Sequence, residues 1–103
     1  MPVALAAALL AVVPRPISHT VTISGFAFSP KIVTVGAGEP VTFVNKDQEA
    51  HTVVAANGAF SSSGLDTNES WTLRVSKPGT YAYFCSLHPY MKGTLIVRAK
   101  AGM

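Results

Sequence analysis

The chain has 103 residues, which is enough for one hydrophobic core but too few for two domains of ordinary size. Hydrophobic residues make up 49% of the sequence and charged residues 13%, a composition that excludes an intrinsically disordered chain. The formal net charge is +3, and because no run of Lys or Arg concentrates it, nucleic-acid binding is disfavoured and an acidic protein partner is favoured.

An apolar stretch rich in alanine and leucine occupies residues 3–13. It is too short to span a bilayer as a helix, which needs about 20 residues, but it suits the apolar part of a signal peptide. No Lys or Arg precedes it, so we interpret it as an export signal truncated at its start; a loosely packed apolar terminus is the alternative. Pro14 and Pro16 then form a linker. We expect this N-terminal segment, residues 1–16, to precede a single domain, residues 17–103, in a periplasmic or otherwise exported protein without a membrane span.

After the linker, apolar and polar residues alternate with the period of β-strands. Gly, Pro, Asn, Asp and Ser separate the alternating runs, and no run has the period or length of a helix. The predicted strands are 18–24 (continuing after a glycine into 26–28), 31–35, 41–45, 52–55, 69–75, 80–85 and 93–99. Short strands at spacings of about 8–12 residues predict an all-β fold, an antiparallel sandwich or barrel. Phe60 and Leu65, in the loop 57–68, are expected to point into its core.

Cys85, His88 and Met91 follow one another at intervals of three residues, at the end of the predicted strand 80–85. Taken singly, each has a simple structural explanation: a buried core thiol, a surface imidazole and a methionine that fills a gap. Cys85 is the only cysteine of the chain, so it has no internal disulfide partner. Together the three side chains offer a thiolate, an imidazole and a thioether to one ion, and His51, after a separate strand, would complete the site.

Convergence on one ion requires a tight loop after Cys85, because residues three apart cannot share one face of a strand. Pro89 fixes its own φ and Gly93 permits a positive φ, so both support such a loop. Thiolate and thioether donors favour copper, whereas zinc prefers four strong donors or an open water position. A Cys–His hydrolase would need an orienting Asn or Asp near Cys85 and His88; the sequence offers none, so we do not expect an enzyme.

The segment 81–97, YAYFCSLHPYMKGTLIV, resembles the C-terminal copper loop of the cupredoxins, the type 1 or blue copper proteins. Within them it resembles the amicyanin-like branch, which has the short loop Cys-x-x-His-x-x-Met. The segments 26–30, 35–43 and 51–53 also occur in the order typical of the family, so the resemblance covers about residues 18–99. It implies a cupredoxin-like Greek-key β-sandwich or barrel of about seven to eight strands that binds one type 1 copper per chain.

Carried over position by position, the resemblance implies that His51, Cys85 and His88 are the trigonal copper ligands and that Met91 is the long axial ligand. The carbonyl of Ala50 would face the opposite axial side.

Two positions beside the ligands depart from the family pattern. Thr52 stands where many relatives have Asn, so the link that this residue makes to the thiolate region is in question. Leu87 stands where amicyanins commonly have Pro, and it keeps a backbone N–H. We expect that N–H to donate a hydrogen bond to the sulfur of Cys85 and to raise the reduction potential.

The function that this resemblance implies is that of a small soluble carrier of single electrons. His88 is the expected electron port, within an apolar docking patch that includes Pro89 and Tyr90. The partners of the protein would be transient redox proteins, and the resemblance implies a dehydrogenase or a c-type cytochrome. Lys92 and other basic residues favour an acidic partner. We expect a monomer. Copper storage or delivery without electron transfer is the alternative, and a domain cut from a larger oxidase or reductase is a third interpretation.

Overall fold

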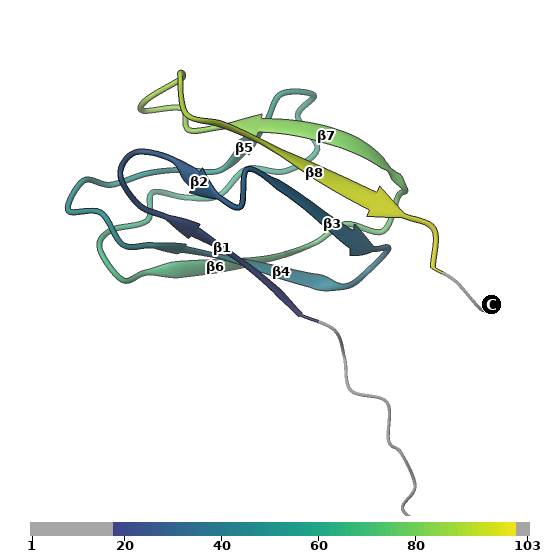
Figure 1. The fold of residues 1–103 in the computed structure, drawn as a ribbon. Helices are drawn as coiled ribbons and strands as arrows, with labels where there is room; N and C mark the ends of the chain where they lie inside the picture. The colour runs from purple at the N-terminus through teal and green to yellow at the C-terminus, as the bar shows by residue number, and fades with distance from the viewer. Residues whose placement is uncertain (1–17, 101–103) are drawn as a thin grey trace, which may run out of the picture.

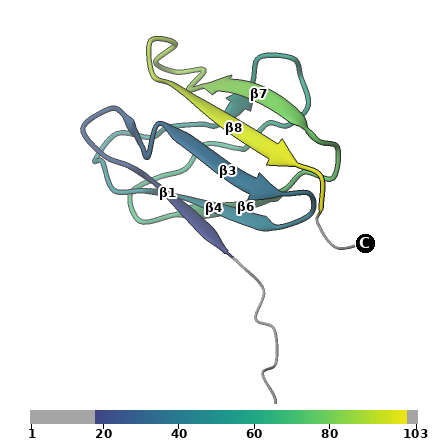
Figure 2. The same ribbon diagram turned by 45° about the vertical axis from the view of Figure 1, so that its right-hand side comes forward.

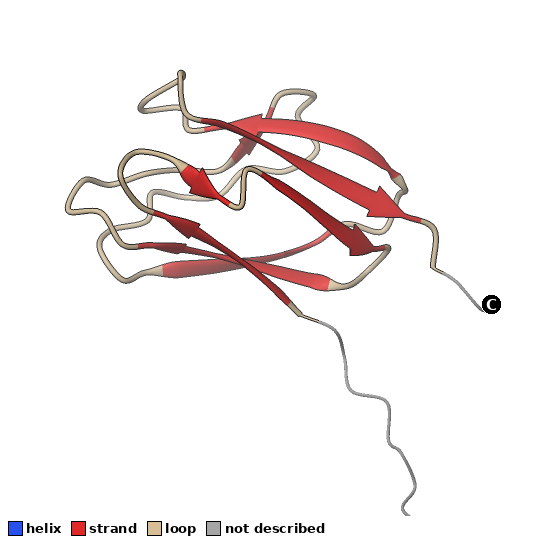
Figure 3. Cartoon of the chain, in the orientation of Figure 1, coloured by secondary structure: helices blue, strands red, loops and turns tan. Residues whose placement is uncertain are grey.

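The computed structural model describes residues 18–100, in which eight strands form two four-stranded sheets packed face to face (Figure 1). The strands are β1 (His19–Ile23), β2 (Phe28–Ser29), β3 (Ile32–Gly36), β4 (Pro40–Asn45), β5 (Val54–Ala55), β6 (Ser70–Arg74), β7 (Gly79–Phe84) and β8 (Lys92–Arg98). These residues contain no helix (Figure 3), and so none that is long and apolar enough to cross a membrane. The expected N-terminal segment, residues 1–16, lies outside the described residues.

One sheet has the strand order β2-β1-β4-β6 and the other has the order β3-β8-β7-β5. The prediction of an all-β sandwich of seven to eight strands is confirmed. The expectation of antiparallel pairing is wrong for two pairs, because β1 runs parallel to β4 and β3 runs parallel to β8 (Figure 2). Alternation of side chains predicts which face of a strand is buried, but it carries no signal for the direction of the neighbouring strand. The chain crosses between the sheets after β2, so β3 pairs with the last strand of the chain.

The core lies between the two sheets and is formed by every second residue of the longer strands, as in β4, where three of six positions are fully buried. Its largest fully buried apolar side chains are Tyr83, Phe43, Ile23, Leu95, Val21, Val41 and Val53. Phe60 and Leu65 are also buried, which confirms the prediction for the loop between β5 and β6. Trp71 is partly buried against Phe43, with ring centroids 6.0 Å apart.

Gly93 is required for packing rather than for a turn. It lies within β8, where it pairs with Tyr83 of β7, and its φ is not among the positive values of the described residues. A Cβ atom on Gly93 would come within 2.5 Å of the Tyr83 ring, so the ring occupies the space over this glycine. The expectation that Gly93 supplies a positive φ to the loop is therefore wrong, because the loop ends before this residue.

Three connections meet at one end of the sandwich (Figure 1). They are the turn after β1, the long connection after β4 and the loop between β7 and β8, which together carry all the predicted ligands. Hydrogen bonds join the first connection to the second, from the N–H of Lys46 to the carbonyl of Ile23 and from the N–H of Gly25 to Asp47, and the N–H of Ser86 joins the third to the second by donating to the hydroxyl of Thr52. The two rigid sheets therefore position three irregular segments against one another, which is a common way to build a functional site.

Candidate metal centre

His51, Cys85 and His88 converge at this end of the sandwich, where one nitrogen or sulfur atom from each lies within 4.8 Å of the other two. The sulfur Sγ of Cys85 lies 3.7 Å from Nδ1 of His51 and 3.8 Å from Nδ1 of His88. His51 and Cys85 have no exposed surface, and His88 is partly exposed. The structure thus brings together three of the predicted ligands, one of them from a segment 34 residues before Cys85.

Backbone hydrogen bonds curl the loop after β7 into the tight form that the spacing of its donors predicts. The carbonyl of Cys85 accepts the N–H of His88 at 3.1 Å, and the carbonyl of His88 accepts the N–H of Met91 at 2.9 Å. The N–H of Cys85 in turn donates to the carbonyl of Met91 at 3.1 Å. The backbone of Met91 is therefore hydrogen-bonded to both Cys85 and His88, and the side chain of Met91 is buried.

Asp47 determines which nitrogen of His51 is free for a metal. Its Oδ2 lies 2.9 Å from Nε2 of His51. Partial burial raises the pKa of Asp47, but the N–H groups of Phe26 and Gly25 and the ring of His51 outweigh it and hold this pKa below its ordinary value. An ionised carboxylate only accepts hydrogen bonds, so Nε2 of His51 donates to it, and Nδ1 is the ring nitrogen that faces the sulfur of Cys85.

Phe26 packs against both imidazoles of the site. Its ring centroid lies 5.0 Å from that of His51 and 4.9 Å from that of His88, edge to face in both cases. The sequence pattern predicts a strand at 26–28, but β1 ends at Ile23 and Phe26 lies in a turn with a φ of 58°. Such a φ costs a bulky residue about 1–3 kcal/mol, so the turn is held by its surroundings.

Thr52 stands where many relatives have Asn, but it still contacts the thiol of Cys85. Its backbone N–H donates to Sγ of Cys85 at 3.3 Å, and its hydroxyl lies 3.8 Å from the same atom. That hydroxyl accepts the N–H of Ser86 at 2.8 Å and is hydrogen-bonded to the hydroxyl of Ser86. The segment after His51 is thereby tied to the ligand loop.

The hydrogen bond expected from Leu87 is absent from residues 18–100, where Thr52 supplies the backbone N–H that donates to the sulfur. Leu87 is instead 55% exposed, because it lies in the middle of the turn that the His88 N–H closes on the Cys85 carbonyl. Ala50 is partly buried directly before the first histidine, and the axial role of its carbonyl stays a prediction.

The rim of the site is apolar and open to solvent. Tyr90 is 68% exposed, its ring centroid lies 6.1 Å from that of His88, and Pro89 between them is exposed. Leu87 and Phe26 are the other exposed apolar side chains next to His88. The predicted patch residues are therefore at the surface around the partly exposed histidine.

The sequence did not point to Asp47, Phe26 or Ser86 as parts of the site. Asp47 lies four residues before His51, within a polar turn typical of loops, so its carboxylate carried no separate signal. Phe26 belongs to a segment that resembles the family, but its position against the histidines depends on a turn more than 20 residues away in the chain.

The donor set fits a type 1 copper site. The Nδ1 atoms of two imidazoles lie close to the sulfur of one thiol, and a buried methionine lies at the end of the same loop. Softness of the sulfur donors favours copper over zinc, for which a thioether is a poor ligand. The enclosed position of Cys85 also shields the thiol from solvent.

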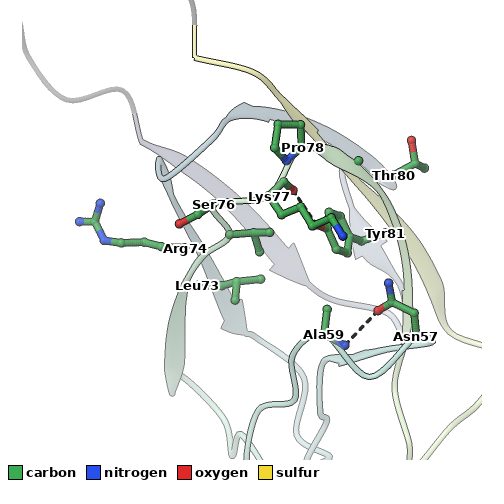
Figure 4. Close-up of a pocket in the computed structure, with 11 residues that line it drawn as sticks. Asn57, Ala59, Leu73, Arg74, Ser76, Lys77, Pro78, Thr80 and Tyr81 are labelled. Carbon is green, nitrogen blue, oxygen red and sulfur yellow. Dashed lines mark hydrogen bonds between the residues drawn. The ribbon is translucent and has the colours of Figure 1, made fainter. Parts of the chain in front are cut away.

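A pocket of about 600 Å³ lies at the other end of β7, away from this cluster (Figure 4). Its lining includes Arg74, Lys77 and Tyr81 but no His, Cys, Asp or Glu. The hydroxyl of Tyr81 donates to the carbonyl of Lys77 at 2.6 Å, and Arg74 donates to the carbonyl of Gly38 at 3.0 Å. The side chains of Tyr81 and Arg74 are thus engaged in structural hydrogen bonds.

Known proteins resemble this chain over most of its length. The family model of the cupredoxin-like domain matches residues 3–97. The sequence is 35% identical over 98 residues to amicyanin-alpha of Methylorubrum extorquens, covering 89% of this chain and 82% of that protein. It is 34% identical over 94 residues to plastocyanin of Dryopteris crassirhizoma, covering 74% of this chain and 92% of that protein. The similarity to amicyanins that the ligand spacing predicts is confirmed.

Solved structures share the fold. A reduced amicyanin variant superimposes with a TM-score of 0.74 at 24% identity, covering 79% of this chain and 82% of that one. A copper-containing nitrite reductase from Thermus scotoductus superimposes with a TM-score of 0.73 at 33% identity, covering 90% of this chain. The match spans 24% of that enzyme, so this chain corresponds to about a quarter of it.

Proposed function

Because this chain belongs to the cupredoxin family, we propose that it binds one type 1 copper ion through His51, Cys85, His88 and Met91 and carries single electrons between proteins. The observation that carries this proposal is the convergence of two Nδ1 atoms and one Sγ atom within 4.8 Å. Copper bound there would supply a one-electron couple between Cu(II) and Cu(I).

The surroundings of these ligands favour fast electron transfer because they leave little room for rearrangement. His51 is fixed by Asp47 on one side and by backbone hydrogen bonds with Leu65 at 3.1 and 2.8 Å on the other. Cys85 is buried and receives the Thr52 N–H, a contact that stabilises a thiolate. A site held in this way changes little between two oxidation states, which lowers the barrier to electron transfer.

Electrons would enter and leave through His88, the one ligand of the three that is partly exposed. Leu87, Pro89, Tyr90 and Phe26 form an apolar rim around it, which we call the docking patch. A patch of this kind supports a small interface that forms and separates quickly, as a carrier with two partners requires.

Basic residues next to the docking patch favour an acidic redox partner. Lys31 and Lys92 are both exposed and line a hollow of about 480 Å³ beside Pro89. With a net charge of +3, this arrangement attracts a negatively charged surface and raises the rate of encounter at low salt. The named relatives, amicyanin and plastocyanin, support a redox protein as the partner, and we propose an exported, copper-accessible compartment as the place of action.

We infer a carrier rather than an enzyme. The similarity to nitrite reductase spans 24% of that protein, whereas amicyanin-alpha is covered over 82% of its length. The single cysteine also supplies one thiolate, whereas a dinuclear copper centre of the type in larger oxidases would need a second.

Copper reconstitution tests this function. Apoprotein mixed with Cu(II) should develop an intense visible band from the bond between thiolate and copper, and should cycle reversibly in voltammetry. Cys85→Ser should abolish the band, whereas His19→Gln, which removes the imidazole at the other end of β1, should leave it unchanged. A colourless protein that holds Cu(I) tightly and shows no reversible wave would contradict electron transfer and support storage or delivery.

A further inference from the structure

One carboxylate joins the turn after β1 to the imidazole of His51. The carboxylate of Asp47 accepts hydrogen bonds from the N–H of Gly25 at 2.7 Å and from the N–H of Phe26 at 2.8 Å. Its Oδ2 also lies within hydrogen-bond distance of Nε2 of His51, at 2.9 Å. Two adjacent backbone N–H groups of one turn and one ligand ring thus share a single carboxylate that is largely shielded from solvent.

Asp47 is itself held in place, so it can act as a fixed point. Its backbone N–H donates to Oδ1 of Asn45 at 2.8 Å, and its carbonyl accepts the hydroxyl of Thr67 at 2.7 Å. Asn45 is fully buried and donates to the carbonyls of Glu49 and Leu65, both at 2.8 Å. The carboxylate is therefore anchored to the end of β4 and to the connection before β6.

The turn that Asp47 holds is a strained one. Gly25 and Phe26 have successive positive φ values of 62° and 58°, and Ser24 and Ala27 close the turn with reciprocal backbone hydrogen bonds of 3.0 and 3.2 Å. Phenylalanine rarely adopts such a φ, so the turn needs the two N–H contacts to the carboxylate to persist.

The result of this strained turn is the position of the Phe26 ring. The rings of Phe26, His51 and His88 lie with all three pairs of centroids between 4.9 and 5.0 Å apart, each pair edge to face. His51 has no exposed surface although Phe26 beside it is 36% exposed. The phenyl ring thus covers one imidazole and packs against the other, which Asp47 does not touch.

We propose that Asp47 and Phe26 form one positioning device that orients both imidazoles before a metal arrives. Asp47 fixes the proton of His51 directly and the ring of His88 indirectly, through Phe26. The proposal rests on the copper-binding function proposed above. It makes Asp47 a positioning residue for a ligand that lies beyond its own contacts.

Nitrogen NMR of the histidine rings in the apoprotein tests the device without any metal. The wild-type protein should show His51 in a single form, with the proton on Nε2, and a fixed His88 ring. Asp47→Ala should give mixed tautomers of His51 and a mobile His88 ring. Phe26→Ala should free His88 but leave the proton of His51 where it is, because the carboxylate remains.

Glu39→Ala is the matched control, since Glu39 makes the same kinds of contact at the other end of the sandwich. Its carboxylate accepts the N–H of Gly36 at 2.6 Å and lies 3.3 Å from Nε2 of His19. This variant should leave the rings of His51 and His88 unchanged.

Copper competition with a chelator gives the second readout. Asp47→Ala and Phe26→Ala should each weaken copper binding, the first by about 10- to 100-fold, as is typical when a residue that orients a metal ligand is lost. The double variant should bind little more weakly than Asp47→Ala alone, because loss of the carboxylate already releases the phenyl ring. If Asp47→Ala does not fold, Asp47→Asn serves in its place, since one amide oxygen cannot serve all three donors, and it should show a smaller loss.

The proposal is overturned if the Asp47 variants keep the wild-type His88 ring signals, or if the losses of the two single variants multiply in the double variant. Failure of the wild-type protein to bind copper would instead contradict the proposed function. The ring signals of the apoprotein would still decide the positioning role in that case.

Discussion

Two tyrosines of β7 offer a paired test of how this fold is stabilised. Tyr81 and Tyr83 lie on the same face of the strand and are 6% and 1% exposed. The hydroxyl of Tyr81 donates to the carbonyl of Lys77 at 2.6 Å. The buried hydroxyl of Tyr83 has no hydrogen-bond partner in the part of the chain that the structure describes, and its burial raises its pKa well above the ordinary value. Substitution by Phe should therefore have opposite effects at the two positions.

The expected magnitudes follow from the two environments. A buried hydroxyl without a partner costs about 1–3 kcal/mol in protein mutational data, so Tyr83→Phe should raise the free energy of unfolding by an amount in that range. Tyr81→Phe removes a hydrogen bond with a net contribution of about 0.5–1.5 kcal/mol and should lower it. For a domain of this size, each 1 kcal/mol corresponds to a shift in Tm of roughly 4–8 °C.

Urea denaturation of the apoprotein measures both changes, because bound metal would add its own stabilisation and hide them. Equal slopes of the unfolding free energy against urea concentration in all three proteins would show that the compared states are the same. If Tyr83→Phe destabilises the protein as much as Tyr81→Phe does, the reasoning is refuted, because the hydroxyl of Tyr83 would then be hydrogen-bonded in solution.

Three further substitutions test other contacts. Gly93→Ala places a Cβ within 2.5 Å of the Tyr83 ring and should lower the free energy of unfolding by about 1–3 kcal/mol, as overpacking does; an unchanged urea midpoint would contradict this. The N–H of Gly36 is the main cause that lowers the pKa of Glu39, so this carboxylate stabilises the fold above its ordinary pKa of 4.5 and stops doing so as the pH falls through the lower folded-state value. The free energy of unfolding of Glu39→Gln should therefore fall less on acidification than that of the wild type. An acid-unfolding curve parallel to that of the wild type would contradict this. Thr52→Val keeps the N–H to the thiol sulfur but removes the hydroxyl that joins two loops, and it should weaken copper binding about 10-fold in chelator competition; wild-type affinity would contradict that role.

Local sequence features determined the strands and the ligand loop. Alternation and turn residues predict seven of the strand positions because burial of one face repeats every two residues along the chain. The spacing of Cys85, His88 and Met91 predicts a curled loop because only such a loop brings the three donors together, and its three backbone hydrogen bonds confirm it. These features depend on residues that are close in sequence.

The tertiary structure alone decided which distant residues complete the site. The parallel pairing of β3 with β8 joins strands that are far apart in the sequence and meet only in the folded sandwich. Asp47 and Phe26 are separated by about 20 residues, and their contact depends on a strained turn that propensity disfavours. The sequence by itself therefore predicted the donors and a copper site, whereas the orientation of those donors follows from long-range contacts that no local pattern encodes.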